Sequence, residues 1–153
     1  MRLFLKFSPQ LCAAAMATLS LGSVAQNTGV GYVKTVTGDA WVTTTGQRIN
    51  AAPGTPILVG SHLRTAPGAT LGITFKDNTL MSFGPDTELT VDEFLYAPAQ
   101  GQLQLTTRLA RGSLNYVSGV IAKLKPEAVQ VKTPTGIIGV RGTQFVAKVE
   151  DAQ

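Results

Sequence analysis

Few side chains in this chain of 153 residues could carry out acid–base, metal or nucleophilic chemistry. The single histidine, His62, has no second metal ligand near it in the sequence, and no serine or cysteine partner for a catalytic triad can be inferred. We therefore interpret His62 as a turn or surface residue. The sequence predicts no metal site.

The only closely spaced carboxylates are Asp86/Glu88 and Asp92/Glu93. A glycosidase needs two carboxyl groups that face one cleft at about 5 to 10 Å. In a strand, Glu88 and Asp92 would share the face opposite the apolar side chains, which we interpret as an outward, solvated face. The same face could meet a basic partner or a divalent ion, but the spacing of a calcium-binding loop is absent. We expect no enzyme, no catalytic residue and no cofactor.

A weak basic cluster consists of Lys123, Lys125, Lys132 and Arg141. Without interleaved aromatic residues it is better interpreted as a solvated face than as a track for nucleic acid. The single tryptophan, Trp41, could stack on a sugar or a base, but its place in a predicted strand favours a packing role. No nucleic-acid partner is predicted.

The N-terminus has the pattern of a signal peptide. Arg2 and Lys6 precede an apolar run, Leu11–Val24, that is too short and too rich in small residues to span a bilayer of about 30 Å. Small residues at the cleavage position predict cleavage after Ala25. Cys12 then lies in the removed part, and the residues before it do not suit lipidation. An uncleaved anchor is the alternative for this run.

Cleavage changes what the composition implies. The full chain carries a net charge of +4, and removal of Arg2 and Lys6 leaves +2, an ordinary value for a soluble domain. The mature chain of about 128 residues would contain no cysteine and hence no disulfide. This length suits one hydrophobic core. We expect a single periplasmic or secreted domain with no membrane span after cleavage.

Period-two alternation of apolar residues predicts strands throughout the mature chain. The clearest hairpin covers 69–83, with Asp77 and Asn78 at its turn, and the longest strand begins at Gln102 and is broken at Arg111–Ser113. Only 119–127 shows helix-like spacing, which predicts no more than one helical turn or a loop. Roughly ten to twelve short strands with frequent turns predict an all-β domain of antiparallel strands, arranged as a sandwich, barrel or roll.

The last segment, 133–149, combines glycines and a proline with β-branched residues, which predicts sharp turns between short strands. In its tail, alternation places Phe145 on the buried face, and we expect a positive φ at Gly142. The segment resembles the closing signature of FecR-like domains, roughly T-P-x-x-x-x-x-x-R-G-T-x-F. The residues that form this signature, together with an upstream glycine, are Gly112, Pro134, Gly136, Gly139, Gly142, Thr143 and Phe145.

The resemblance extends over most of the mature chain, from about Val33 to Val149. FecR-like domains commonly carry G-x-x-L-x-x-G-x-x-[LI]-x-T, which Gly54–Thr65 matches except that Leu58 is one residue off, and L-x-x-G-x-[LV], which Leu109–Leu114 matches. At the hairpin turn the family usually has D-G, where this chain has Asn78. The resemblance implies a lead-in at 26–32, an all-β domain at 33–149 and a tail at 150–153.

In familiar FecR-like proteins the domain is the periplasmic part of a regulator that relays transporter occupancy to a cytoplasmic segment binding a sigma factor. We expect neither the second half of such a receptor nor a transmembrane helix in the mature chain, so the resemblance implies only an exported, non-catalytic binding or sensing module that contacts a protein or envelope component. Arg141 is the candidate contact for that partner. The alternative is a structural protein of the envelope whose exposed strand edges join copies into an oligomer.

Overall fold

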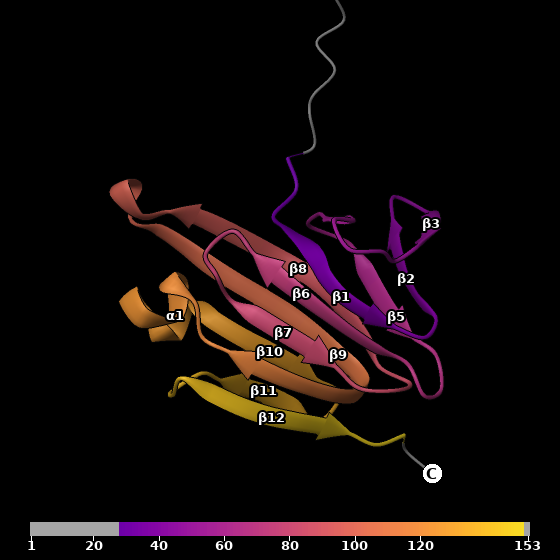
Figure 1. Ribbon diagram of the computed structural model, residues 1–153. Helices are drawn as coiled ribbons and strands as arrows, with labels where there is room; N and C mark the ends of the chain where they lie inside the picture. Colours follow the sequence, from indigo (N-terminus) through magenta and orange to yellow (C-terminus); the bar gives the residue numbers. More distant parts are fainter. Residues whose placement is uncertain (1–27, 152–153) are drawn as a thin grey trace, which may run out of the picture.

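The computed structural model describes residues 28–151, so the predicted signal peptide and its cleavage site lie outside the described residues. Figure 1 shows the arrangement of the elements. In order they are β1 (Gly31–Thr37), β2 (Ala40–Thr44), β3 (Gln47–Asn50), β4 (Pro56–Ile57), β5 (His62–Thr65), β6 (Thr70–Phe75), β7 (Leu80–Phe83), β8 (Glu88–Ala97), the 3-10 helix η1 (Pro98–Gln100), β9 (Gln102–Val117), α1 (Val120–Leu124), the 3-10 helix η2 (Pro126–Ala128), β10 (Val129–Thr133), β11 (Gly136–Gly139) and β12 (Gln144–Val149). The first strand starts within the predicted lead-in.

The strands form one sheet that curls around a single core, which confirms the predicted all-β fold. Its main path runs β3-β2-β5-β8-β9-β7-β6-β1-β4, and β10, β11 and β12 lie off this path. The curl packs apolar side chains from both halves into one cluster, with Leu63 and Leu89 from one half and Leu71 and Tyr116 from the other. Burial of these side chains is the main stabilising contribution to such a domain.

The 16-residue strand β9 joins the two halves of the sheet. Its first part pairs with β8 and β10, and its last part pairs with β7 and β12. At the change of partners lies Gly112, with φ +89°. The predicted break at Arg111–Ser113 is therefore wrong, because the glycine turns the strand from one half into the other without ending it.

One pairing departs from the predicted antiparallel arrangement. Strand β10 runs parallel to β9, with Val129 opposite Leu105 and Lys132 opposite Arg108. Parallel neighbours need a crossover connection, and α1 and η2 provide it. The periodicity of a strand does not specify the direction of its neighbour, so this pairing was not foreseen.

Asp77 ties the β6–β7 turn to the crossover. Its buried carboxylate accepts hydrogen bonds from the backbone N–H of Thr79 (3.1 Å), the hydroxyl of Thr79 (2.8 Å) and the backbone N–H of Ile121 (3.2 Å). Its carbonyl also accepts from Val120 N–H at 2.7 Å. Asn78 has φ +65°, the left-handed conformation expected at this turn. The carboxylate and the carbonyl of Asp77 thus each satisfy one free N–H group at the start of α1, whose five residues match the expected single turn.

The closing signature folds in part as predicted. In β12, Phe145 is half-buried and Ala147 is buried, as the alternation indicates. Gly142 does not have the expected positive φ, and a Cβ atom there would meet only Gln144 O, at 4.0 Å. That expectation is wrong, and nothing in the structure requires glycine at 142. The Gly142 carbonyl instead accepts a hydrogen bond from the Ser118 hydroxyl at 2.7 Å, which fastens the start of β12 beside the end of β9.

Two further signature glycines lie in a strand and not in a turn. Gly136 and Gly139 are the first and last residues of β11, which pairs antiparallel with β10. The turn between these strands is made by Pro134 and Thr135, because Thr133 lies opposite Gly136 in the register. Proline sets the φ angle that the first position of such a turn requires.

Candidate functional site

The predicted carboxylates lie on the outer face of the sheet and are engaged in ion pairs. Glu88 lies 3.0 Å from Arg111 and 3.4 Å from Arg64, and His62 is 3.9 Å from the same carboxylate. These residues come from the adjacent strands β5, β8 and β9, and the register places Glu88 opposite both arginines. Cross-strand pairs of this kind stabilise the sheet. The face is outward as predicted, but Glu88 is bonded within the sheet and only partly exposed.

The other sequence-predicted polar candidates are dispersed. Asp92 pairs with Arg108 at 3.0 Å, at the position where the β8–β9 register shifts. Trp41 is half-buried, and the guanidinium of Arg48 stacks 4.2 Å from its ring centroid. The lysines of the basic cluster, Lys123, Lys125 and Lys132, lie on the helix α1, at its C-terminal cap and on β10. These positions do not form one continuous basic track.

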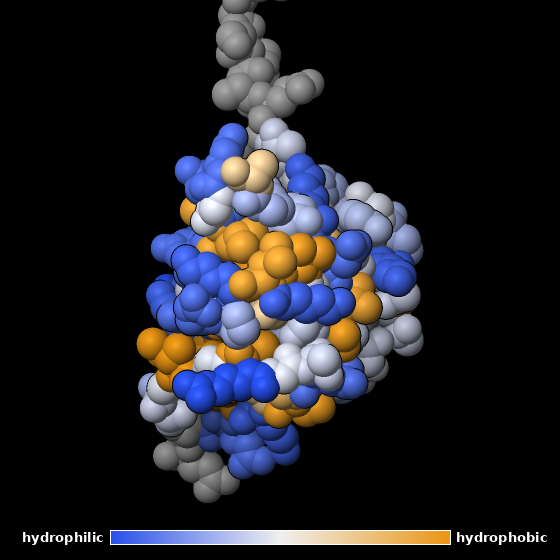
Figure 2. Space-filling view, turned by 90° about the vertical axis from the view of Figure 1, so that its left-hand side faces the viewer, coloured by the Kyte–Doolittle hydropathy of each residue, from blue (hydrophilic) through white to orange (hydrophobic). Residues whose placement is uncertain are grey.

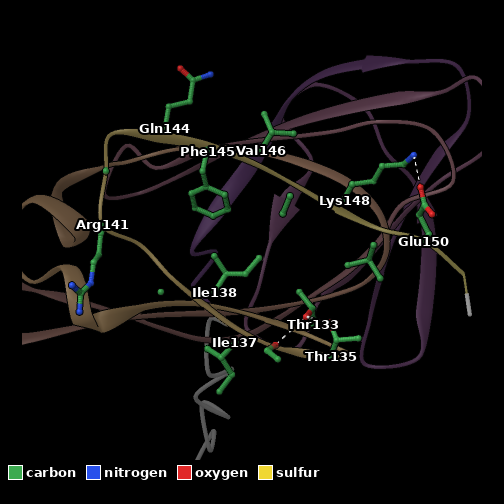
Figure 3. Close-up of a pocket in the computed structure, with 15 residues that line it drawn as sticks. Thr133, Thr135, Ile137, Ile138, Arg141, Gln144, Phe145, Val146, Lys148 and Glu150 are labelled. Carbon is green, nitrogen blue, oxygen red and sulfur yellow. Dashed lines mark hydrogen bonds and ion pairs between the residues drawn. The ribbon is translucent and has the colours of Figure 1, made fainter.

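A groove lies between β11 and β12, and every residue of both strands lines it. We call it the β11–β12 groove; it encloses about 720 Å³. Figure 3 shows Phe145 of β12 and Ile138 of β11 pointing toward one another across it. The closing signature thus builds both walls.

The inner walls of the groove are apolar and continue into the core. Phe145 stacks on the buried Tyr116 with a centroid separation of 4.9 Å, and Ile138 lies opposite the buried Val131 in the sheet. Burial raises the pKa of Tyr116, and the nearby hydroxyls of Ser118 and Thr79 offset this only in part, since neither is in hydrogen-bonding geometry with the phenol oxygen. The apolar side of the groove thus rests on a buried, neutral phenol.

Both strands of the groove have an unpaired edge. Within residues 28–151, β11 pairs only with β10 and β12 pairs only with β9. The free edge of β12 covers six residues, and its Val146 is 72% exposed. Unpaired N–H and C=O groups along such an edge can accept another strand. Sequence periodicity predicted β12 but could not predict that its second edge has no neighbour.

Arg141 lies at one end of the groove, in the connection between the two strands (Figure 3). Its side chain is exposed and has no ion-pair or hydrogen-bond partner among the described residues. By contrast, Lys148 on the same wall is paired with Glu150 at 2.9 Å, an interaction that lowers the pKa of Glu150. The groove therefore offers a guanidinium that remains available to an anionic group. Arg141, the candidate contact from the sequence, thus lies at the end of a groove.

Apolar side chains also gather elsewhere on the surface. Figure 2 shows apolar patches separated by polar groups on the face that carries α1 and the β8–β9 connection. Leu95 of β8 is 52% exposed, and Leu124 of α1 is 60% exposed. These residues do not line the β11–β12 groove, and they provide a comparison for it.

In residues 28–151, no group of three or more histidine, cysteine, aspartate or glutamate side chains is arranged to hold a metal ion. No helix of that part is long and apolar enough to cross a membrane.

The fold defines the class of protein as an all-β domain, a curled half-barrel sheet around one core, with a groove at the open side of that sheet. A family model described as FecR protein matches residues 61–153, more than half of the chain, and the chain therefore belongs to the FecR family. Comparisons with curated proteins and with solved structures gave no match. The FecR family acts in sensing and signal transduction together with partner proteins, and it is typically periplasmic or membrane-associated.

Proposed function

We propose that this protein is an exported, non-catalytic sensing module that binds a partner protein of the cell envelope in the β11–β12 groove. The observation that carries the proposal is the groove itself, with apolar walls, two unpaired strand edges and a guanidinium at one end. Protein-binding surfaces combine a small apolar centre with a few polar anchors at the rim. The groove has this composition, and the signature of a sensing family forms it.

The charges elsewhere on the sheet support this assignment. Glu88 and Asp92 are paired with arginines of neighbouring strands, so these two carboxylates are less available to a ligand. Arg141, in contrast, forms no such pair within the described residues. A cation that is not used by the fold is the more direct candidate for recognition of a partner.

A structural role in the envelope is the second candidate, and the number of free edges favours it. Besides β11 and β12, the strands β3 and β4 end the main path of the sheet. Copies could join through these edges by strand addition. Sedimentation over a range of concentrations distinguishes the two functions, because assembly predicts species that grow with concentration and a sensing module predicts a constant monomer.

The test of the proposed function is capture of a partner from an envelope extract with the full chain and two exposed variants. Val146→Arg places a charge on the outer face of β12, at the rim of the groove, and Leu95→Arg places one in the comparison patch; both positions are exposed, so neither change should disturb the core. We expect one partner to be captured by the wild-type chain and by Leu95→Arg, and to be lost with Val146→Arg. Equal capture by all three proteins would contradict a site in the groove.

A further inference from the structure

We propose that the partner binds as an extended segment that pairs with the free edge of β12 at the mouth of the β11–β12 groove, antiparallel to β12, with a carboxylate at the Arg141 end. This inference rests on the proposed function and specifies how the groove recognises its partner. Addition of a strand to an exposed edge combines backbone hydrogen bonds, which supply affinity, with alternating side-chain contacts, which supply specificity.

The register of β12 shows which of its backbone groups are available. Ser118 N–H donates to the Thr143 carbonyl at 2.8 Å, and Gln144 lies opposite Val117. In an antiparallel pair, hydrogen-bonded and non-bonded positions alternate. The N–H and C=O groups of Gln144, Val146 and Lys148 therefore point away from β9, toward the open edge.

The walls of the groove specify the pattern of the added segment. Every second side chain of an added strand points to the same face. Those on the inner face would meet Phe145, Ala147 and Ile138, which are apolar and buried or half-buried. Apolar residues at alternate positions are therefore expected in the partner segment, with polar residues between them facing solvent.

Arg141 specifies the direction of the segment. Strand β12 runs away from Arg141, from Gln144 to Val149, so an antiparallel segment ends beside the guanidinium. A carboxylate there would form a charge-assisted hydrogen bond. An acidic side chain and the free C-terminus of the partner both supply this group.

The guanidinium of Arg141, which is unpaired within residues 28–151, favours a segment that ends in an anionic group as the occupant. A second copy of this protein is the alternative occupant, because its β12 also has one free edge. The test below separates the two.

The test uses a set of synthetic peptides of about nine residues, long enough to cover the edge of β12. They carry valine, leucine or phenylalanine at every second position with threonine between them, and end in aspartate with an amidated terminus, in a free carboxylate, or in an amidated lysine. Binding to the full chain is measured by titration calorimetry. Matched peptides that are N-methylated on the edge-facing residues have the same side chains but cannot donate the backbone hydrogen bonds.

The matched protein variants are Val146→Pro and Val146→Thr. Proline removes an N–H group that faces the open edge, where its loss costs the fold no ladder hydrogen bond, whereas threonine keeps that group. We expect Val146→Pro and peptide N-methylation each to weaken binding about tenfold or more, and Val146→Thr to bind within about threefold of wild type. Arg141→Ala should abolish the preference for carboxylate-ending over lysine-ending peptides. The two carboxylate peptides show which source of the anion binds better.

The inference is overturned if no peptide of the set binds, if Val146→Pro binds as wild type does, or if N-methylation has no effect. A concentration-dependent dimer of the wild-type chain that Val146→Pro dissociates would also overturn it, because the occupant would then be a second copy. If strand addition fails while capture from the envelope extract still depends on the groove, the proposed function stands and only this binding mode is wrong.

Discussion

Replacement of Gly112 by alanine should destabilise the domain more than any other glycine-to-alanine change outside the Gly119 contact. The residue has φ +89°, which costs a non-glycine residue about 1 to 2 kcal/mol. A Cβ atom there would also lie 2.7 Å from Thr87 Cβ and closer still to the Thr87 backbone. Relief of such overlap in a packed region costs about 1 to 3 kcal/mol. We expect a total loss of about 2 to 5 kcal/mol.

Thr87 cannot move aside easily, because it is part of a buried network. Its hydroxyl donates to the Gly84 carbonyl at 2.9 Å and accepts from Ser113 N–H at 3.0 Å, and its own N–H donates to the Thr65 hydroxyl at 2.9 Å. These bonds join β5 to β9 beside Gly112, where β9 turns from one half of the sheet into the other. We call this place the corner of the sheet. A domain of this size has a total stability of about 5 to 15 kcal/mol, so the loss is a large part of it.

Two matched variants separate conformational strain from the collision. Gly101 has φ +66° and open space around it, so Gly101→Ala should cost only about 1 kcal/mol. Gly142 has neither a positive φ nor a close neighbour, so Gly142→Ala should be neutral or slightly stabilising. Urea unfolding followed by circular dichroism measures all three. If Gly112→Ala and Gly101→Ala lose the same stability, Thr87 does not fix the corner and the reasoning is refuted.

The remaining predictions concern export, the groove wall, an alkaline transition and the outer face. The mass of the exported protein should correspond to a chain that begins at Gln26, and a mass that includes the leader would contradict export with cleavage. Phe145→Ala should cost about 2 to 4 kcal/mol in thermal unfolding, because it removes a half-buried ring stacked on Tyr116, whereas a neutral result would mean that the ring does not support the core. Because burial raises the folded-state pKa of Tyr116, the stability that the neutral phenol contributes is present below pH of about 10 and is lost as the pH rises above that value. Tyr116→Phe should therefore lose less stability than wild type between about pH 8 and 11, and equal losses would refute the assignment. His62→Ala and Glu88→Gln should each cost less than about 1 kcal/mol and leave partner capture within a few fold of wild type, since they alter only partly exposed ion pairs; loss of capture would place the site on the outer face.

Local patterns in the sequence were sufficient for the strands that alternate cleanly. The β6–β7 hairpin follows from the alternation of Leu71 and Ile73 with polar or small residues and from a turn of Asp77 and Asn78. Local patterns were insufficient where one residue connects strands that are far apart in the sequence. Gly112 resembles a strand breaker in isolation, and only the positions of β7, β8, β10 and β12 show that it is a corner.

The candidate site was predictable only as a list of residues. The closing signature and Arg141 could be identified from the sequence, but Gly136 and Gly139 indicated a turn where the structure has the strand β11. A groove exists because β11 and β12 do not pair with each other, and the absence of a long-range pairing leaves no periodic signal in either segment. The carboxylate of Asp77 was likewise missed as a ligand of α1, since its partner Ile121 is far away in the sequence.

Site-specific photo-crosslinking in living cells tests the central claim most directly. A photoreactive amino acid is placed at Val146, at the rim of the β11–β12 groove, or at Leu95, in the comparison patch, with both positions exposed. Binding of an envelope protein in the groove predicts a discrete adduct from position 146 that disappears with Arg141→Glu, and no such adduct from position 95. An adduct from position 95 alone, or one from position 146 that contains only this chain, would contradict the account.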